Sequence, residues 1–257
     1  MNKQNIVFSD LDGTLLEHNT YSFEDALPML KFLKKNNIPL ILTTSKTKNE
    51  VIKLQKMLDI NYPFIVENGG GIFIERFDNY DCIPLGFSYK QILKFFNNYS
   101  KQFDILGFSQ MSVKEIISHT GLSDRDAAFS KQRDFTEPFL LDDKNQFEEL
   151  KNIAKKDGLD IVKGGRFYHL ISKGQNKANA MKKVLEIFTK KDNKDYTSIA
   201  LGDSENDVSM LKSADFPIVI PRIDGSNLEL DIKNLTIASY SGPKGWNEAL
   251  REYFYAK

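Results

Sequence analysis

Short apolar runs alternate with amphipathic segments along the first 83 residues of the chain. Residues 6–8 (IVF) and the segment "IPLILTT" have no charged side chains, which is typical of strands buried on both faces of a sheet. Apolar residues recur at helical spacing after Ser22 and in "KNEVIKLQKML". "PFIVENGGGIFI" predicts a strand that runs into a triple-glycine turn. This alternation predicts an α/β domain whose parallel sheet lies between layers of helices.

The pattern changes near Pro84 and returns beyond Lys173. A smaller α+β unit is predicted between these positions. Its helices and strands are expected in "GFSYKQILKFFNNYSKQF", "MSVKEIISHTGLSD", "RDFTEPFLL" and "GGRFYHLIS". The first pattern then resumes in "NKANAMKKVLEIF", "TSIAL" and "FPIVI". We therefore predict a Rossmann-like, doubly wound core in two pieces, residues 1–83 and 173–257, with a cap domain inserted at residues 84–172.

Composition limits the expected partners and cellular location of the protein but does not assign a function. The 35 basic residues balance 35 acidic ones, so no overall field attracts nucleic acid or an anionic membrane, and neither partner is expected. No apolar segment approaches the roughly 20 residues of a membrane-spanning helix. Cys82 is the single cysteine and the start "MNKQN" lacks the apolar region of a secretory signal, so a cytoplasmic location is expected. The composition leaves the oligomeric state open.

Two carboxylates follow the first predicted strand. Asp10 and Asp12 are two positions apart, so on an extended backbone both side chains point to the same side. Like charges and a bound cation in one crevice would separate their proton affinities, which allows one group to act as nucleophile while the other carries a proton. An isolated D-x-D-G stretch is also a common polar turn, so this pair alone does not distinguish a catalytic site from a turn.

A second acidic loop strengthens the catalytic interpretation. "ALGDSENDVSML" places Asp203 and Asp207 directly after another predicted strand. Because the carboxyl ends of parallel strands emerge at the same edge of a sheet, Asp10, Asp203 and Asp207 are expected to meet there. Carboxylate oxygens suit a hard cation with near-octahedral geometry, and Mg²⁺ is therefore the expected cofactor.

Four ordered segments resemble the motifs of the haloacid dehalogenase superfamily: "DLDGT", "LILTT", the lysine of "NKANAM" and "GDSEND". The insertion resembles the cap of the Cof-like subgroup. The resemblance spans nearly the whole chain and implies phosphoryl transfer through an aspartyl-phosphate. It implies that Asp10 is the nucleophile and a metal ligand. Asp12 would act as general acid and base, with its backbone carbonyl on the metal.

The same resemblance implies the remaining catalytic roles. Thr44 would hydrogen-bond the transferring phosphoryl group, and Lys177 would offset its charge. Lys173 competes for the role of Lys177, but the spacing to the following helix favours Lys177. Asp203 would ligate Mg²⁺ directly. Asp207 is a further candidate metal residue, which would either ligate the ion directly or hold a metal-bound water or the lysine.

A narrower resemblance concerns "ENGGGIFI", "TEPFLL", "GGRFYHL" and "SGPKGWNEAL", which are similar to segments of the mannosyl-3-phosphoglycerate phosphatase family. That family releases mannosylglycerate, a compatible solute. The resemblance implies a small phosphorylated sugar or glycosyl-glycerate substrate, whose anionic groups need guanidinium forks and whose hydroxyls need carboxylate or amide acceptors. Lys46, near a predicted helix start, is a further candidate for contact with an anion. The candidate substrate-binding residues are Ser45, Lys46, Asn68, Gly69, Gly70, Arg133, Glu137, Arg166, His169 and Asn206.

Other functions stay open at this point. Another sugar-phosphate phosphatase, including one that acts on glucosyl-3-phosphoglycerate, would share the chemistry. A phosphomannomutase would keep the nucleophile but return the phosphoryl group to a sugar. A binding protein without turnover would normally have lost an essential group, whereas Asp10 and Asp12 are both present.

Overall fold

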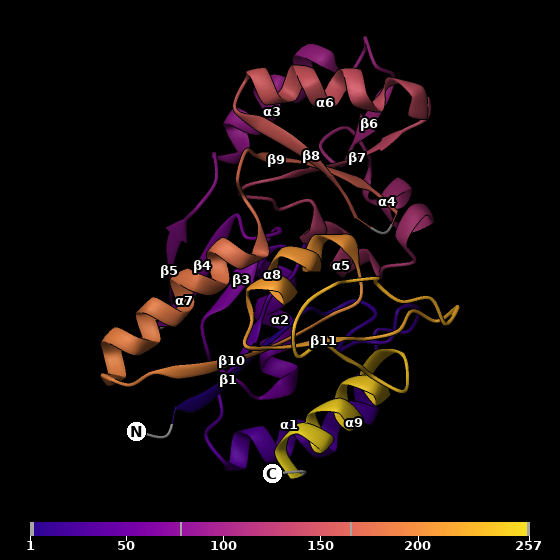
Figure 1. Cartoon of the computed structure of the whole chain (residues 1–257). Helices are drawn as coiled ribbons and strands as arrows, with labels where there is room; N and C mark the ends of the chain where they lie inside the picture. Colours follow the sequence, from indigo (N-terminus) through magenta and orange to yellow (C-terminus); the bar gives the residue numbers. More distant parts are fainter. Residues whose placement is uncertain (1–2, 78, 165, 256–257) are drawn as a thin grey trace.

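The computed structural model describes residues 3–77, 79–164 and 166–255 (Figure 1). A core domain carries a cap formed by the middle of the chain, in magenta to salmon, at the top of the view. The predicted core pieces begin at residue 1 and end at residue 257, two positions outside the described residues. The domain boundaries at 83/84 and 172/173 stay predictions.

Five parallel strands form the core sheet, in the order β12-β11-β10-β1-β2. Their bounds are β1 Gln4–Ser9, β2 Leu40–Leu42, β10 Tyr196–Gly202, β11 Phe216–Val219 and β12 Thr236–Ile237. Because every pair is parallel, all carboxyl ends lie at one edge, which is where ligands bind in such sheets.

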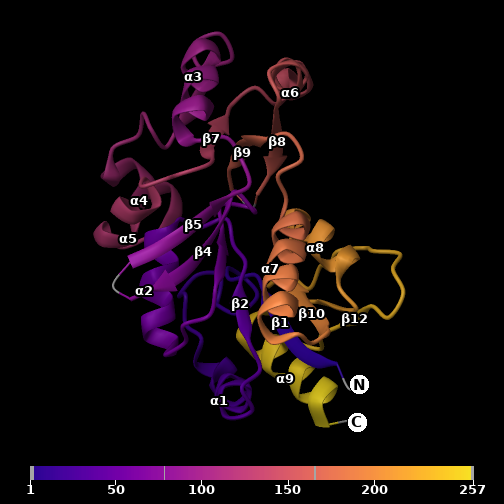
Figure 2. The same ribbon diagram turned by 90° about the vertical axis from the view of Figure 1, so that its left-hand side faces the viewer.

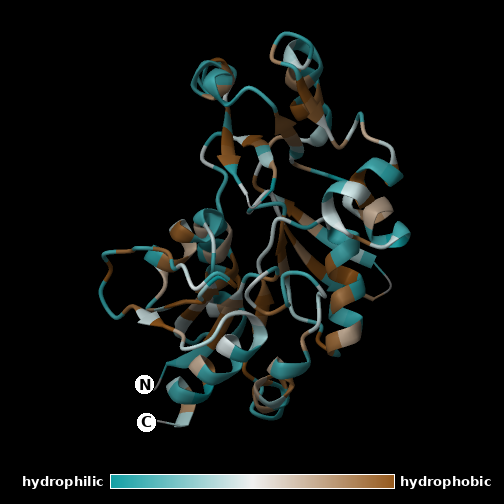
Figure 3. Ribbon diagram, turned by 90° about the vertical axis from the view of Figure 1, so that its right-hand side faces the viewer, coloured by the Kyte–Doolittle hydropathy of each residue, from teal (hydrophilic) through white to brown (hydrophobic). Residues whose placement is uncertain are grey.

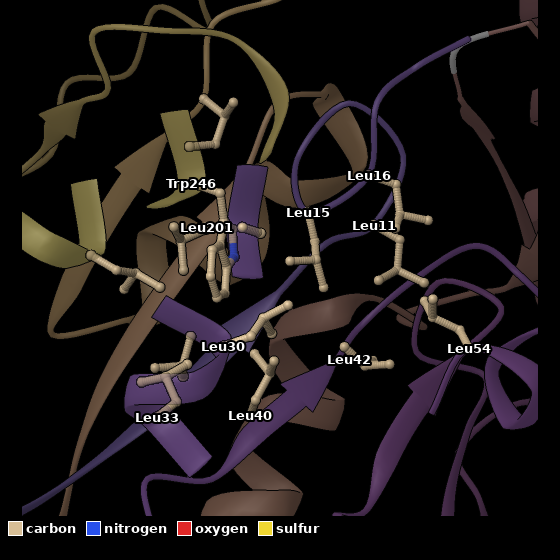
Figure 4. Packing of buried hydrophobic residues seen from close by; sticks show 14 of the residues in the cluster. Leu11, Leu15, Leu16, Leu30, Leu33, Leu40, Leu42, Leu54, Leu201 and Trp246 are labelled. Atoms are coloured by element: carbon tan, nitrogen blue, oxygen red, sulfur yellow. The ribbon is translucent and has the colours of Figure 1, made fainter. Parts of the chain in front are cut away.

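Helices cover both faces of this sheet, as predicted. They are α1 Leu27–Lys35, α2 Lys48–Leu58, α7 Lys177–Asp192, α8 Val208–Ser213 and α9 Gly242–Tyr255, with short 3₁₀ turns η1 Glu24–Ala26 and η3 Glu205–Asp207. Alternate strand residues enter separate apolar clusters: Val7 packs with α1, α2 and α9, whereas Ile6 and Phe8 pack with α7 and α8. Figure 4 shows the first cluster, with Trp246 of α9 beside Leu201 of β10. The predicted doubly wound α/β core is confirmed.

A small antiparallel sheet follows β2. It consists of β3 Phe64–Val66, β4 Gly71–Arg76 and β5 Asn79–Pro84. The predicted glycine turn joins β3 to β4, with left-handed backbone at Glu67, Asn68 and Gly69 (φ 50°, 58° and 85°). A Cβ atom at Gly69 would lie 2.2 Å from the carbonyl oxygen of Asn176, so this position admits only glycine.

The cap is built on a four-stranded antiparallel sheet in the order β6-β7-β9-β8. Helices α3 and α6 pack on it through one apolar cluster, and Phe108 and Phe167 pack with α4 and α5 in another (Figure 2). Its elements are α3 Tyr89–Tyr99, β6 Ile105–Gly107, α4 Val113–Thr120, α5 Asp124–Ser130, β7 Glu137–Leu141, η2 Lys144–Gln146, α6 Phe147–Lys156, β8 Leu159–Lys163 and β9 Tyr168–Ser172.

Hydrophobic colouring is concentrated on the central strands of the core and of the cap, whereas the helices carry both hydrophilic and hydrophobic segments (Figure 3). Within residues 3–77, 79–164 and 166–255, no helix has the length and hydropathy required to span a bilayer.

Candidate active site

The candidate site begins where β1 and β10 end. These strands pair in parallel, with Ser9 opposite Leu201, so Asp10 and Asp203 leave the sheet side by side. The turn η3 brings Asp207 back toward them. One carboxylate oxygen from each of Asp10, Asp203 and Asp207 lies within 4.8 Å of the others. The sheet edge thus assembles the three carboxylates that the sequence predicted to meet.

Lys177 is the cation of this cluster. It is the first residue of α7, and its Nζ lies 2.6 Å from Asp10 Oδ1 and 2.6 Å from Asp207 Oδ1. Burial alone lowers the pKa of Lys177, but the charges of Asp10 and Asp207 outweigh this effect, and the net shift is upward. The alternative, Lys173, is exposed. The structure therefore places Lys177, a charged ammonium group, at the predicted nucleophile.

The cluster carries more negative than positive charge. Burial and the charge of Asp207 raise the pKa of Asp10, although Lys177 opposes them. Burial and Asp207 likewise raise the pKa of Asp203 to about 7. A divalent cation held by Asp10 and Asp203 would relieve this repulsion, so the residues present fit the expected metal.

Asp207 also organises the loop around it. Its Oδ1 accepts from Lys177, and its Oδ2 accepts from the backbone N–H groups of Asp203 (3.2 Å) and Ser204 (3.1 Å). Asp207 thereby connects the lysine to the acidic loop, which is one of the roles predicted for it. Direct ligation of the metal by Asp207 stays a prediction.

Asp12 faces the same region and is paired with Lys46. Oδ2 of Asp12 lies 2.9 Å from Lys46 Nζ, whereas the buried Oδ1 has no hydrogen-bond partner in the described part of the chain. Lys46 also lies over the ring of Tyr21, 4.9 Å from its centroid. One oxygen of Asp12 is thus held by Lys46, while the other is buried without a partner among the described residues and has its hydrogen-bonding capacity unused.

The loop after β2 supplies hydrogen-bond donors. The Lys46 N–H donates to Thr44 Oγ1 at 3.1 Å, which leaves the hydroxyl hydrogen of the buried Thr44 for another acceptor. Nδ2 of Asn206 donates to Asn68 Oδ1 at 3.0 Å, and the N–H of Asn68 donates to the Thr44 carbonyl at 2.9 Å. Thr44, Asn68 and Asn206 are therefore brought together at the site.

A pocket of about 190 Å³ lies between this site and the cap. The core contributes polar residues to it, including Asp10, Asp12, Ser45, Lys46, Asp203 and Asn206. The cap contributes Phe108, Thr120, Leu122, Arg133, Arg166, Phe167 and His169. The charged end can hold a phosphate, and the mixed cap wall can contact the remainder of an organic phosphate.

His169 is neutral in this pocket. Only 8% of the residue is exposed, and its Nδ1 has no partner among the residues with described positions. Burial, followed by the charges of Arg133 and Lys177, lowers the pKa of His169 from 6.5 to about 3. The imidazole can thus form a hydrogen bond with an uncharged hydroxyl without carrying charge at neutral pH.

A pH-dependent stability follows from this burial. The folded protein keeps His169 neutral down to about pH 3, whereas the unfolded chain takes up the proton near pH 6.5. This contribution to stability is therefore present above pH 6.5 and should fall by about 2 kcal/mol by about pH 5. Urea unfolding at about pH 7.5 and about pH 5 measures the loss of stability between these pH values. The loss in His169→Gln should be smaller than the loss in the parent by that amount. Equal losses of stability in the variant and the parent would contradict the lowered pKa of His169.

Glu137, Gly69 and Gly70 are predicted substrate contacts that do not line this pocket, and Asn68 does not line it either. Glu137 is fully buried, and its carboxylate accepts from the hydroxyls of Tyr89 and Ser109, each at 2.6 Å. It stabilises the inside of the cap, because its oxygens are occupied by cap donors. Gly69 and Gly70 allow close packing: a Cβ at Gly70 would lie 2.4 Å from Cβ of Phe135. The described pocket wall includes none of these four residues.

Arg133 reaches the pocket but is bound to protein. Each nitrogen of its guanidinium donates to the chain, Nε to the Thr136 carbonyl (3.0 Å), Nη1 to that of Ser130 (3.2 Å) and Nη2 to that of Ser45 (2.8 Å). Arg166, in contrast, is exposed and donates only through Nη1, to the His119 carbonyl, among its described hydrogen bonds. Of the two predicted arginines, Arg166 is the one available to an anionic ligand.

Among the site residues that were not singled out from the sequence are Thr14 and Tyr21. Thr14 donates to Asp203 Oδ1 at 3.2 Å, and its position at the end of "DLDGT" was a usable signal. Tyr21 packs against Lys46 from a loop with left-handed backbone (φ 57°). No local pattern identified Tyr21, because its role depends on where the loop returns.

Comparisons with known proteins agree with this geometry. The haloacid dehalogenase-like hydrolase family matches residues 7–221. A Persephonella marina protein named glucosyl-3-phosphoglycerate/mannosyl-3-phosphoglycerate phosphatase is 43% identical over 256 residues, which cover 95% of each chain. A protein of the same name from Methanococcoides burtonii is 36% identical over 265 residues, which cover 97% of each chain.

Solved structures share the fold. A Thermoplasma acidophilum protein superposes with a TM-score of 0.74 at 20% identity, covering 98% of this chain and 99% of its own. A phosphatase of the haloalkanoate superfamily from Bacteroides thetaiotaomicron gives 0.71 at 16% identity, covering 98% and 95%. At these identities the likeness concerns the fold alone.

Proposed function

This chain belongs to the haloacid dehalogenase-like hydrolase family and is a phosphatase, and from that premise we propose that it hydrolyses 2-O-mannosyl-3-phosphoglycerate to mannosylglycerate and phosphate. The observation that carries the proposal is the placement of Asp10, which pairs with Lys177 at 2.6 Å beside Asp203 and Asp207. The two relatives named for both sugars support this substrate class. Because of those names, the glucosyl compound is the second candidate.

Asp10 is the proposed nucleophile. An oxygen of its carboxylate forms a bond to phosphorus while the bond from phosphorus to the glycerate oxygen breaks, which yields an aspartyl-phosphate. Lys177 favours the ionised form of Asp10 by its charge, and the Thr44 hydroxyl donates to a phosphoryl oxygen. Asp10 and Asp203 would hold the cation, Mg²⁺ in our proposal, which would supply positive charge for the phosphoryl group.

Asp12 is the proposed acid and base. Its carboxyl group gives a proton to the departing glycerate oxygen, and the resulting carboxylate takes a proton from the water that attacks the aspartyl-phosphate. The second step releases phosphate and returns Asp10 to its free form. Oδ2 is paired with Lys46 at 2.9 Å, so the unpaired Oδ1 is the proposed atom for both transfers.

Specificity is proposed to come from pocket residues on both the core side and the cap side. Lys46 and Arg166 are cations that can bind the glycerate carboxylate. His169 and Asn206 offer groups for the hydroxyls of the sugar. These contacts explain why a phosphoglycerate would be preferred over a simple hexose phosphate.

The direct test is phosphate release from a substrate panel with added Mg²⁺. The panel contains mannosyl-3-phosphoglycerate, glucosyl-3-phosphoglycerate, mannose 6-phosphate and p-nitrophenyl phosphate. The proposal expects the highest kcat/KM on a glycosyl-phosphoglycerate. A higher kcat/KM on the hexose phosphate would reject the substrate class, and an isomerised sugar phosphate without free phosphate would indicate a mutase.

Arg166→Ala tests the specificity contact within the same panel. Losing a charge-assisted contact should lower kcat/KM for mannosyl-3-phosphoglycerate by roughly a hundredfold. Hydrolysis of p-nitrophenyl phosphate, which lacks the glycerate carboxylate, should stay near that of the parent. Arg125→Ala is the matched control, because Arg125 is exposed on α5 and contacts the ring of Phe129. Equal losses on both substrates would assign Arg166 to folding or cap closure.

A further inference from the structure

The loop of residues 44–46 is held from the cap side by one arginine. Nη2 of Arg133 donates to the carbonyl oxygen of Ser45 at 2.8 Å, a contact between residues 88 positions apart. Only 7% of Arg133 is exposed. This contact fixes the middle of the loop that presents Thr44 on one side and Lys46 on the other.

Arg133 is itself fixed by a buried carboxylate. Its Nε lies 3.3 Å from Oε2 of Glu67, a residue with no exposed surface in the turn between β3 and β4. Glu67 also accepts from the backbone N–H groups of Asp134 (2.7 Å), Phe135 (3.1 Å) and Thr136 (2.8 Å). The core turn thus holds the segment after α5 through a fully satisfied carboxylate.

Thr136 completes the cluster. Its hydroxyl donates to Glu67 Oε2 at 2.9 Å and accepts from Arg133 Nη2 at 2.9 Å. Burying an ion pair is costly, and an apolar substitute is often equally stable. An apolar side chain could not donate a hydrogen bond to the Ser45 carbonyl, as the guanidinium does. This hydrogen bond is therefore a reason to bury a charged residue here.

We infer that Glu67, Arg133 and Thr136 form a positioning cluster that sets the 44–46 loop for phosphoryl transfer. The inference rests on the proposed function. Arg133 acts through Ser45: the adjoining Lys46 N–H aims the Thr44 hydroxyl by donating to its oxygen at 3.1 Å, and Lys46 Nζ holds Asp12 at 2.9 Å. A shift of the Ser45 peptide would therefore misplace two groups together: the Thr44 hydroxyl that donates to the phosphoryl group, and the acid–base group of Asp12.

Arg133→Lys is the test, because it keeps a positive charge beside Glu67 but lacks the fork that reaches Ser45. Misplacing the loop should lower kcat by about ten- to a hundredfold on both mannosyl-3-phosphoglycerate and p-nitrophenyl phosphate. KM should change by less than about threefold, because the guanidinium nitrogens of Arg133 donate to protein acceptors and the inference gives this residue no contact with substrate. Thr136→Val keeps side-chain size and removes the bridging hydroxyl, so it should give a smaller loss of the same kind.

Lys53→Met is the matched control. Lys53 Nζ binds Asp126 at 2.6 Å and 2.8 Å, which joins α2 to α5 without contact to the 44–46 loop. Its kcat should equal that of the parent. Amide hydrogen exchange gives a second measurement: the Lys46 N–H should exchange faster in Arg133→Lys and at the parental rate in Lys53→Met.

The outcomes separate this inference from the proposed function. An unchanged kcat and unchanged exchange in Arg133→Lys would overturn the inference. A rise in KM confined to mannosyl-3-phosphoglycerate would also overturn it, because that result identifies a substrate contact. If the parent protein releases phosphate from no member of the panel, the proposed function fails, while the exchange rates still decide whether Arg133 positions the loop.

Discussion

Asp10→Asn is expected to lower kcat for phosphate release by at least about a thousandfold, because an amide cannot form the aspartyl-phosphate. The substitution keeps an oxygen that can accept from Lys177 and removes one of three crowded negative charges. The variant should therefore fold, and its unfolding temperature should not fall below that of the parent. Phosphate release on the full panel and thermal unfolding measure the two properties together.

The control for this variant is Asp224→Asn. Asp224 is exposed on a neighbouring loop, where it accepts from the N–H and hydroxyl of Ser226. Its replacement should leave kcat unchanged. Activity of Asp10→Asn within tenfold of the parent, in protein free of contaminating phosphatase, would show that the nucleophile is another group.

Removal of divalent metal should abolish phosphate release, and added Mg²⁺ should restore it. Three carboxylates within 4.8 Å face one ammonium group, so the phosphoryl charge cannot be accommodated without a further cation. EDTA treatment followed by gel filtration and titration with Mg²⁺ measures this effect. Full activity of the metal-free protein would contradict it.

The apparent affinity for Mg²⁺ should also depend on pH. The metal-free Asp203 carboxyl has a pKa of about 7, and ligation requires its ionised form. Below pH 7 the proton competes with the metal, so the affinity should fall as the pH is lowered and level off above it. Asp203→Asn should weaken Mg²⁺ binding about a hundredfold or more and remove most of this dependence, as measured by calorimetry.

The core fold could be predicted because its signals are local. Alternation of apolar runs with helical segments identifies strands buried on both faces, and the separate packing of Val7 and Phe8 is the structural counterpart. Strand β5, Asn79–Pro84, was missed because none of its residues is buried, so it lacks the apolar pattern of a core strand. Strand β12 has only two residues, too few for any periodicity.

The candidate site could be predicted in part for the same reason. Parallel strands end at one edge, so Asp10 and Asp203 meet wherever the topology brings β1 beside β10. The function of a guanidinium could not be read in this way. Arg133 and Arg166 carry the same side chain, yet Arg133 donates to a backbone carbonyl from a distant part of the chain, whereas Arg166 is exposed. The placement of Glu137 could not be predicted for the same reason, because its hydrogen-bond partners Tyr89 and Ser109 lie 48 and 28 positions away in the sequence.

The central claim is that phosphate passes through the Asp10 carboxylate, and peptide mass spectrometry after acid quenching during turnover tests it most directly. The Asp12→Asn variant is used beside the parent with p-nitrophenyl phosphate, whose leaving group departs without a proton, because slower activation of water should then allow the intermediate to accumulate. We predict an acyl phosphate on Asp10 that disappears on treatment with hydroxylamine. An acyl phosphate on any other residue, or steady phosphate release by Asp10→Asn, would contradict the account.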